Sequence, residues 1–114
     1  MTGASGFIAA HIVGNLLGRG YRVRGTVRNP DRKADLAFLT GLPGADERLE
    51  LVRGDLLDPR SWDAAVAECE YVLHTASPYQ IDVKDPQRDL VDPAVLGTRH
   101  VLDACMWAGV KRVV

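Results

Sequence analysis

The sequence predicts an α/β fold built around a doubly wound parallel sheet. Segments with the two-residue period of strands alternate with segments of helical period. Each helical segment is long enough to carry the chain back across a sheet, which favours parallel strands joined by right-handed crossovers. A glycine-rich turn at residues 2–9 opens directly into the first helical segment. In such folds ligands bind at the carboxyl ends of the strands, close to the point where the strand order reverses.

The glycine-rich turn reads Thr-Gly-Ala-Ser-Gly-Phe-Ile-Ala and is built to hold a phosphate. Gly3 and Gly6 let the backbone approach a pyrophosphate without a Cβ clash. The N–H groups at the following helix start point at the ligand, and the helix dipole favours its negative charge. The spacing G-x-x-G-x-x-A departs from the common G-x-G-x-x-G pattern, so the turn alone could merely start a helix. The helix and strand that follow it provide the order a dinucleotide site requires.

The first half of the chain is predicted to hold two helices and two strands. Apolar residues recur at helical intervals after the turn, and Gly18 and Gly20 supply a stop. A strand-like alternation of residues follows, which places Val23, Gly25 and Val27 on one face of a strand and the polar residues between them on the other. The expected elements are a helix over 7–19, a strand over 21–27, a short helix over 31–39, a loop over 40–47 and a strand over 49–53.

The second half continues the same alternation. Asp58 followed by Pro59 predicts a helix start, with an acid at the N-cap and proline at the first helical position. Pro93 lies inside a long helical pattern and should kink it or mark its first turn. The inner face of the first helix is predicted to be Trp62, Ala65, Val66 and Cys69. The later elements are a buried strand over 71–76, a polar loop through residue 86, a helix ended by Gly109 and a strand beginning in 110–114.

Composition excludes several classes of function. The 114 residues suffice for one domain, and 14 Lys and Arg against 15 Asp and Glu leave a formal net charge of −1. We therefore expect no nucleic-acid partner and no anionic membrane partner. No apolar run could span a bilayer and no signal-peptide pattern is present, so a cytoplasmic location is expected.

Cysteine and histidine usage predicts no metal site. Cys69 and Cys105 stand far apart, without a second ligand at metal spacing, and are expected to be buried thiols. His11, His74 and His100 are equally scattered, and we expect surface or packing roles for them.

Five motifs along the chain resemble those of the extended short-chain dehydrogenase/reductases, a superfamily that includes NAD-dependent epimerases and dehydratases. Within it, the chain looks most like the dihydroflavonol reductase and cinnamoyl-CoA reductase branch. The motifs are the glycine-rich turn, Thr26-Val27-Arg28, Gly54-Asp55-Leu56, the segment from His74 to Pro78 and Val95-Leu96-Gly97-Thr98. The resemblance implies a partial NAD(P)-binding domain of Rossmann type over residues 1–114, from an oxidoreductase that reduces an aldehyde or ketone.

The resemblance also implies where the cofactor would be contacted. The implied contacts are Gly3, Ser5, Gly6, Phe7 and Ile8 at the pyrophosphate, Asp55 and Leu56 at the adenine, and Thr75, Ala76 and Ser77 near the nicotinamide-side ribose. Asp55 could instead be a turn-forming acid after a strand. Gly97 and Thr98 are expected to pack beneath the site.

Arg28 favours NADP over NAD. NAD-specific enzymes usually place an acid at the end of the second strand to bind the ribose 2′-OH, whereas a guanidinium suits a 2′-phosphate. Lys33 and, less surely, Arg32 could add positive charge, although an exposed basic residue near a helix start is often only solvated.

Two departures from the family pattern leave catalysis open. The family's Ser and Tyr-x-x-x-Lys are absent, and Tyr79 and Lys84 are five residues apart, so we assign no catalytic residue. The apolar strand that normally precedes the glycine turn is absent too, which should open the middle of the sheet and leave the chain poorly stable. We therefore expect a fragment of a longer reductase. The alternatives are a non-catalytic NAD(P)-binding module or a fragment of a nucleotide-sugar epimerase or dehydratase.

Overall fold

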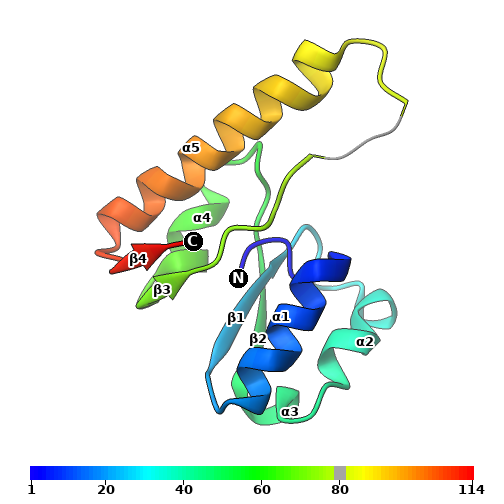
Figure 1. The fold of residues 1–114 in the computed structure, drawn as a ribbon, viewed down its shortest axis with the longest axis vertical. Helices are drawn as coiled ribbons and strands as arrows, with labels where there is room; N and C mark the ends of the chain where they lie inside the picture. The colour runs from blue at the N-terminus through cyan, green and yellow to red at the C-terminus, as the bar shows by residue number, and fades with distance from the viewer. Residues whose placement is uncertain (79–81) are drawn as a thin grey trace.

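A computed structural model of the chain describes residues 1–78 and 82–114, so Tyr79 lies outside the described residues. Helices and short strands alternate along the chain (Figure 1). In chain order the elements are α1 (Phe7–Gly18), β1 (Val23–Val27), the 3₁₀ turn η1 (Lys33–Leu36), α2 (Ala37–Thr40), α3 (Ala45–Arg48), β2 (Leu49–Arg53), α4 (Ser61–Val66), β3 (Tyr71–Val72), the π-helical turn η2 (Gln87–Val91), α5 (Asp92–Trp107) and β4 (Arg112–Val113).

The sheet consists of two parallel pairs with the N-terminal segment between them. Strand β1 pairs with β2 over five residues, and β3 pairs with β4 over two. The carbonyl oxygen of Met1 accepts a hydrogen bond from the N–H of Thr26 at 2.9 Å, and the N–H of Thr2 donates to Leu73 at 2.9 Å. Residues 1–4 therefore lie between β1 and β3 (Figure 1), where a doubly wound sheet has its first strand.

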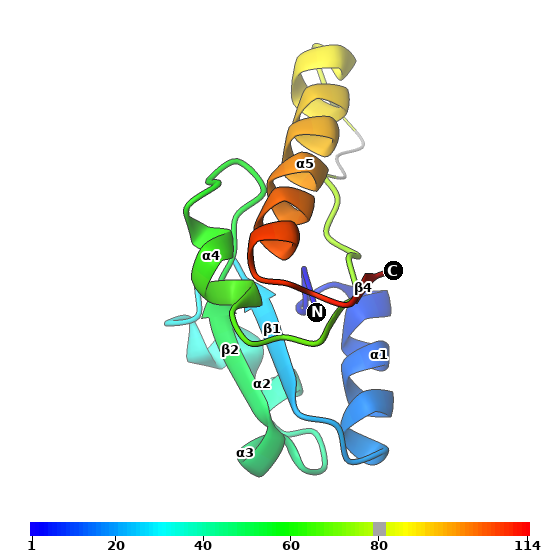
Figure 2. The same cartoon turned by 90° about the vertical axis from the view of Figure 1, so that its left-hand side faces the viewer.

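Helices cover both sides of this arrangement, as predicted for a doubly wound sheet. Helix α1 and helix α4 lie on opposite sides of the β1–β2 pair (Figure 2). Two separate groups of buried side chains result. The first group comprises Ala4, Val13, Leu17, Val23, Val27, Leu36, Leu39 and Ala45. The second comprises Trp62, Ala65, Val66, Val72, Val101, Ala104 and Cys105. Three of the four residues predicted for the inner face of α4 are therefore confirmed, whereas Cys69 lies after the end of the helix and is only partly buried.

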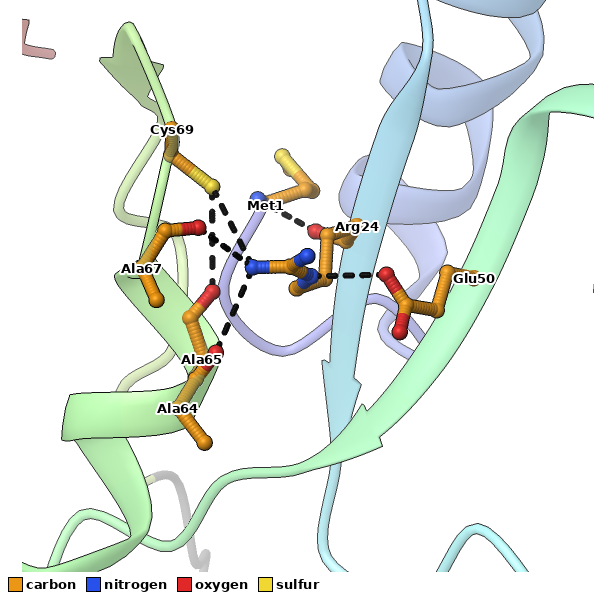
Figure 3. Close-up of polar contacts among 7 residues, drawn as sticks. All are labelled: Met1, Arg24, Glu50, Ala64, Ala65, Ala67 and Cys69. Carbon is orange, nitrogen blue, oxygen red and sulfur yellow. Dashed lines mark hydrogen bonds and ion pairs between the residues drawn. The ribbon is translucent and has the colours of Figure 1, made fainter.

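The two groups of buried side chains mark two parts of the molecule: the first contains α1, β1, α2, α3 and β2, and the second contains α4, β3, α5 and β4. Arg24 connects the two parts across the space between β1 and α4 (Figure 3). Its Nε donates to Glu50 on β2 at 2.8 Å. Its Nη1 donates to the carbonyl oxygen of Ala67 at 2.6 Å and to that of Ala64 at 3.3 Å. These carbonyl groups lie at the end of α4, where helical hydrogen-bonding partners run out. One strand residue thereby satisfies a helix terminus in the other part of the molecule.

Several element boundaries differ from the prediction. The helix expected over 31–39 is a 3₁₀ turn followed by one α-helical turn, and the expected loop over 40–47 contains most of α3. Helix α4 begins at Ser61, because the Asp58 carbonyl accepts the N–H of Ser61 in a turn while its carboxylate pairs with Arg53 at 2.6 Å. Asp58 is therefore not the N-cap. Pro93 marks the first turn of α5, as one of its two predicted outcomes.

The predicted buried strand over 71–76 is much shorter than expected. Only Tyr71 and Val72 form β3, and Tyr71 is exposed. A single parallel bridge joins His74 to Thr2, after which the chain leaves the ladder. Strand β4 likewise pairs over only two residues.

Candidate functional site

Helix α1 begins without a cap. Gly6 at the N-cap offers no side chain, and the first turn carries no acidic residue. Within the described part of the chain, the N–H groups of Phe7, Ile8 and Ala9 donate to no backbone or side-chain acceptor. The side chains of Phe7 and Ile8 are 82% and 69% exposed, so this helix start faces solvent. Free N–H groups at the positive end of a helix attract an anion.

The turn that precedes α1 is held in place from two sides. Gly3 has φ +63°, a conformation that favours glycine, and a Cβ there would lie 3.1 Å from the Cα of Ala76. On the other side, the N–H of Gly3 donates to Thr26 Oγ1 at 3.2 Å, and that of Ala4 donates to the Thr26 carbonyl at 2.9 Å. Gly3 is thus required both by its conformation and by the close approach of Ala76.

Positive charge lies just beyond the strand that supports this turn. Arg28 directly follows β1 and is two residues from Thr26, which hydrogen bonds to the glycine turn. Arg28 and Lys33 are exposed, and neither forms an ion pair within residues 1–78 and 82–114. Arg32 instead pairs with Asp35 at 2.8 Å, which partly neutralises its charge. Arg28 and Lys33 are therefore free to meet a phosphate, and Arg32 less so.

Asp55 and Leu56 occupy a tight turn after β2. The Asp55 carboxylate accepts the N–H of Leu57 at 3.0 Å, so it has the turn-forming role considered above. Leu56 is half-buried beneath α5, where a Cβ on Gly97 would lie 2.7 Å from the Leu56 Cβ. The packing role predicted for Gly97 is confirmed. Contact of Asp55 and Leu56 with an adenine stays a prediction.

The segment after β3 is attached to the start of the chain. Thr2 Oγ1 accepts the N–H groups of Thr75 and Ala76, both at 3.0 Å, and Thr75 Oγ1 donates to the Thr2 carbonyl at 2.7 Å. This brings Ala76 against Gly3, so two predicted parts of the site meet. Ser77 is exposed and lies one residue further along.

His74 belongs to the same cluster, although the sequence indicated only a surface or packing role for it. Its Nδ1 lies 2.9 Å from Thr2 Oγ1, and its Nε2 lies 3.3 Å from Thr98 Oγ1 on α5. The ring is half-buried, and burial lowers the pKa of His74 below its ordinary value of 6.5. The sequence signal for this role is its place in the motif from His74 to Pro78.

A pocket of about 470 Å³ lies beside the helix start, between α1 and α2. The rings of Phe7 and His11 meet edge to face, with centroids 4.8 Å apart. The residues that line the pocket are Ser5, Phe7, Ala10, His11, Phe38 and Leu42. It therefore shares Ser5 and Phe7 with the helix start but includes none of the residues at the strand ends.

Within the described residues, no group of three or more His, Cys, Asp or Glu side chains could hold a metal ion. No helix in this part of the chain has the length and apolar character needed to cross a membrane. Cys69 and Cys105 are free thiols, of which only Cys105 is fully buried.

Comparison with known proteins gives one family profile and many relatives. The profile, described as NAD(P)H-binding, matches residues 3–114. A cinnamoyl-CoA reductase of Medicago truncatula is 49% identical over all of this chain and 35% of its own length. A dihydroflavonol 4-reductase of Dianthus caryophyllus is 42% identical over all of this chain and 32% of its own length.

Solved structures give the same result. The crystal structure of a yeast methylglyoxal/isovaleraldehyde reductase complexed with NADPH matches with a TM-score of 0.84 and 33% identity. The match covers 98% of this chain and 34% of the yeast chain. The chain thus spans about a third of the length of the proteins it matches.

Proposed function

The chain belongs to the NAD(P)H-binding family, and we propose that it is the cofactor-binding part of an NADP-dependent reductase acting on an aldehyde or ketone. The relatives confirm the branch indicated by the sequence, that of the dihydroflavonol and cinnamoyl-CoA reductases. We also propose that residues 1–114 form one partial NAD(P)-binding domain.

One observation carries the preference for NADP. Arg28 is exposed and unpaired within the described chain, directly beyond a strand that supports an uncapped helix start. A guanidinium forms two parallel hydrogen bonds to a phosphate, whereas a ribose hydroxyl offers no charge to pair with it. The NADPH found in the yeast relative supports the same preference. Lys33 would add a second positive charge to this phosphate subsite.

The remaining contacts follow from the positions of the strand ends. Gly3, Ser5, Gly6, Phe7 and Ile8 would hold the pyrophosphate at the start of α1. Asp55 and Leu56 would meet the adenine. Thr75, Ala76 and Ser77 would lie beside the nicotinamide-side ribose, because Thr2 holds this segment against the glycine turn.

Within this proposal the cofactor supplies the hydride, and the residues of this chain bind and orient it. We assign no proton donor to the chain, because neither a Ser nor a Tyr-x-x-x-Lys fits the family pattern here. Carbonyl reduction is proposed from the relatives, of whose length the chain spans about a third. A cytoplasmic location and the absence of nucleic-acid or membrane partners stay predictions.

Reversing the charge at residue 28 tests the proposal. We expect Arg28→Asp to weaken NADP⁺ binding about 10- to 100-fold, since a hydrogen bond to a charged group contributes about 1.5–3 kcal/mol. NAD⁺ binding should change little, because NAD⁺ lacks the 2′-phosphate. Isothermal titration calorimetry with both nucleotides gives the two dissociation constants.

The matched control is Arg22→Asp, which makes the same charge change at an exposed position before β1. It should leave the ratio of the two dissociation constants unchanged. An unchanged ratio in Arg28→Asp as well would overturn the assignment of Arg28 to the 2′-phosphate. Failure of the unaltered chain to bind either nucleotide, in a sample whose amide hydrogen exchange shows the folded state, would overturn the proposed cofactor role.

A further inference from the structure

The hydrogen bonds around Thr2 determine where its hydroxyl proton lies. A hydroxyl group has one proton to donate and two lone pairs that accept. The N–H groups of Thr75 and Ala76 both donate to Thr2 Oγ1, each at 3.0 Å. The third neighbour of this oxygen is His74 Nδ1, at 2.9 Å. Because both lone pairs are occupied, the Thr2 hydroxyl must donate its proton to His74 Nδ1.

This assignment fixes the state of the His74 ring. Its Nδ1 accepts, so a neutral ring carries its proton on Nε2. Nε2 lies 3.3 Å from Thr98 Oγ1, which is able to accept that proton. A chain of hydrogen bonds therefore runs from the N–H groups of residues 75 and 76 through Thr2 and His74 to α5.

The charged groups nearby do not explain the neutral ring. The segment of residues 1–4 contributes the Met1 amino group, which donates to the Arg24 carbonyl instead. Helix α5 carries Arg99 and His100 next to Thr98, and His100 hydrogen bonds to the Leu56 carbonyl. Val114, after β4, accepts the backbone N–H of His74 rather than a ring proton. Burial alone shifts the pKa of His74, and it favours the neutral form.

We propose that His74 is a positioning residue. By accepting a hydrogen bond from the Thr2 hydroxyl, it holds residues 75 and 76 against the glycine turn, and protonation of its ring weakens cofactor binding. The proposal rests on the proposed NADP site. A protonated ring carries hydrogen on Nδ1 and needs a lone pair on Thr2 Oγ1. Both lone pairs of this oxygen already accept the N–H groups of Thr75 and Ala76, so one of these two hydrogen bonds must break. Ala76 lies against Gly3, so this loosens the turn that would hold the pyrophosphate.

Two substitutions of His74 separate its role as a hydrogen-bond acceptor from a role in packing alone. His74→Asn can keep an acceptor oxygen close to the position of Nδ1, but it cannot be protonated in this pH range. His74→Leu removes the acceptor. At about pH 7.5 we expect His74→Asn to bind NADP⁺ nearly as well as the unaltered chain, and His74→Leu to bind roughly fivefold more weakly.

The pH dependence gives the more specific result. Between about pH 7.5 and pH 4.5, the affinity of the unaltered chain for NADP⁺ should fall more steeply than that of His74→Asn. The additional fall should be centred below 6.5, the ordinary value that burial lowers. The 2′-phosphate of NADP⁺ itself titrates near pH 6, and it affects both proteins alike.

A measurement without cofactor tests the same hydrogen bonds. Long-range ¹H–¹⁵N spectra of the histidine rings should show the Nε2–H tautomer for His74 at neutral pH, and the amides of Thr75 and Ala76 should be protected from exchange. An Nδ1–H tautomer would overturn the inference.

The cofactor titrations distinguish this inference from the proposed function. NADP⁺ binding that is identical in pH dependence for the unaltered chain and His74→Asn would overturn the role of His74 alone. If the unaltered chain shows the expected tautomer but binds no NADP⁺, the proposed function fails, and the effect of His74 on cofactor binding falls with it.

Discussion

The two parts of the molecule have the same α/β pattern, but their parallel ladders differ in length. In the first, β1 and β2 pair over five residues each and are covered by α1 and α2. In the second, β3 and β4 pair over only two residues, and the N-terminal end of α5 projects away from the other elements (Figure 1). The first part is held by its own parallel ladder, whereas β3 is also joined to the N-terminal segment through the bridge between Thr2 and His74.

Both long helices bury one face and leave apolar side chains exposed at one end. Helix α1 buries Ala9, Val13 and Leu17 but exposes Phe7 and Ile8 at its start. Helix α5 buries Val101, Ala104 and Cys105 but exposes Met106 and Trp107 at its end, at 75% and 87%. Apolar residues at helical spacing thus predict where a helix forms, but the face that is covered depends on the elements available to pack on it.

The candidate site lies where the two parts meet. The glycine turn, α1 and Arg28 come from the first part, and Thr75 and Ala76 come from the second. The hydrogen bonds that join the parts include those of residues 1–4 and Arg24, and Val52 on β2 packs against the second core. Changes confined to one part should therefore act mainly on that part, and changes at the connections should act on both.

Trp62→Ala should have the largest effect. The side chain is 1% exposed at the centre of the second core, and removing a buried Trp costs about 3–5 kcal/mol. Amide hydrogen exchange should accelerate in α4 and α5 while β1 and β2 keep their protection. Trp62→Phe is the milder control, because it retains most of the ring volume and removes an indole N–H without a partner in the described chain. Equal loss of protection in both parts would contradict this picture.

Gly97→Ala should have an intermediate effect. The added methyl group would lie 2.7 Å from the Leu56 Cβ, so α5 must shift away, at a cost of about 1–3 kcal/mol. Denaturant unfolding gives the change in the free energy of unfolding. The matched control is Gly18→Ala at the end of α1, where no atom lies within 4 Å and alanine favours the helix. If Gly97→Ala is as well tolerated as this control, close packing of α5 on Leu56 is wrong.

Arg24→Met should have a smaller effect on stability, and this effect should extend to both parts of the molecule. The substitution leaves the Ala67 carbonyl without its donor, at a cost of about 1 kcal/mol. Amide exchange should increase at the end of α4 and in β1 together. Arg53→Met removes an exposed ion pair with Asp58 and should change neither. An effect restricted to β1 would show that Arg24 does not connect the parts.

Sequence patterns predicted the local features well. Strand β2 has the predicted bounds, and α1 ends one residue before the predicted end. Both elements depend on patterns contained within a few neighbouring residues. Helix α3 was missed, because Gly44 adopts φ +81° directly before it and residues 41–44 resemble an ordinary loop.

Contacts between distant residues could not be predicted in this way. The hydrogen bond between Thr2 and His74 joins residues 72 positions apart, and no local pattern marks His74 as its partner. The family resemblance placed Thr75 and Ala76 near the site, but their attachment to Thr2 is seen only in three dimensions. The unpaired state of Arg28 likewise depends on which acidic residues the fold brings near it.

Mapping the amide shifts of the chain during titration with NADPH tests the central claim most directly, that the α1 start and Arg28 form one dinucleotide site. We expect the largest changes at Ser5, Phe7, Ile8 and Arg28. NADH should produce the changes at the helix start but a much smaller change at Arg28. Changes centred elsewhere, or an equal response of Arg28 to both nucleotides, would contradict it.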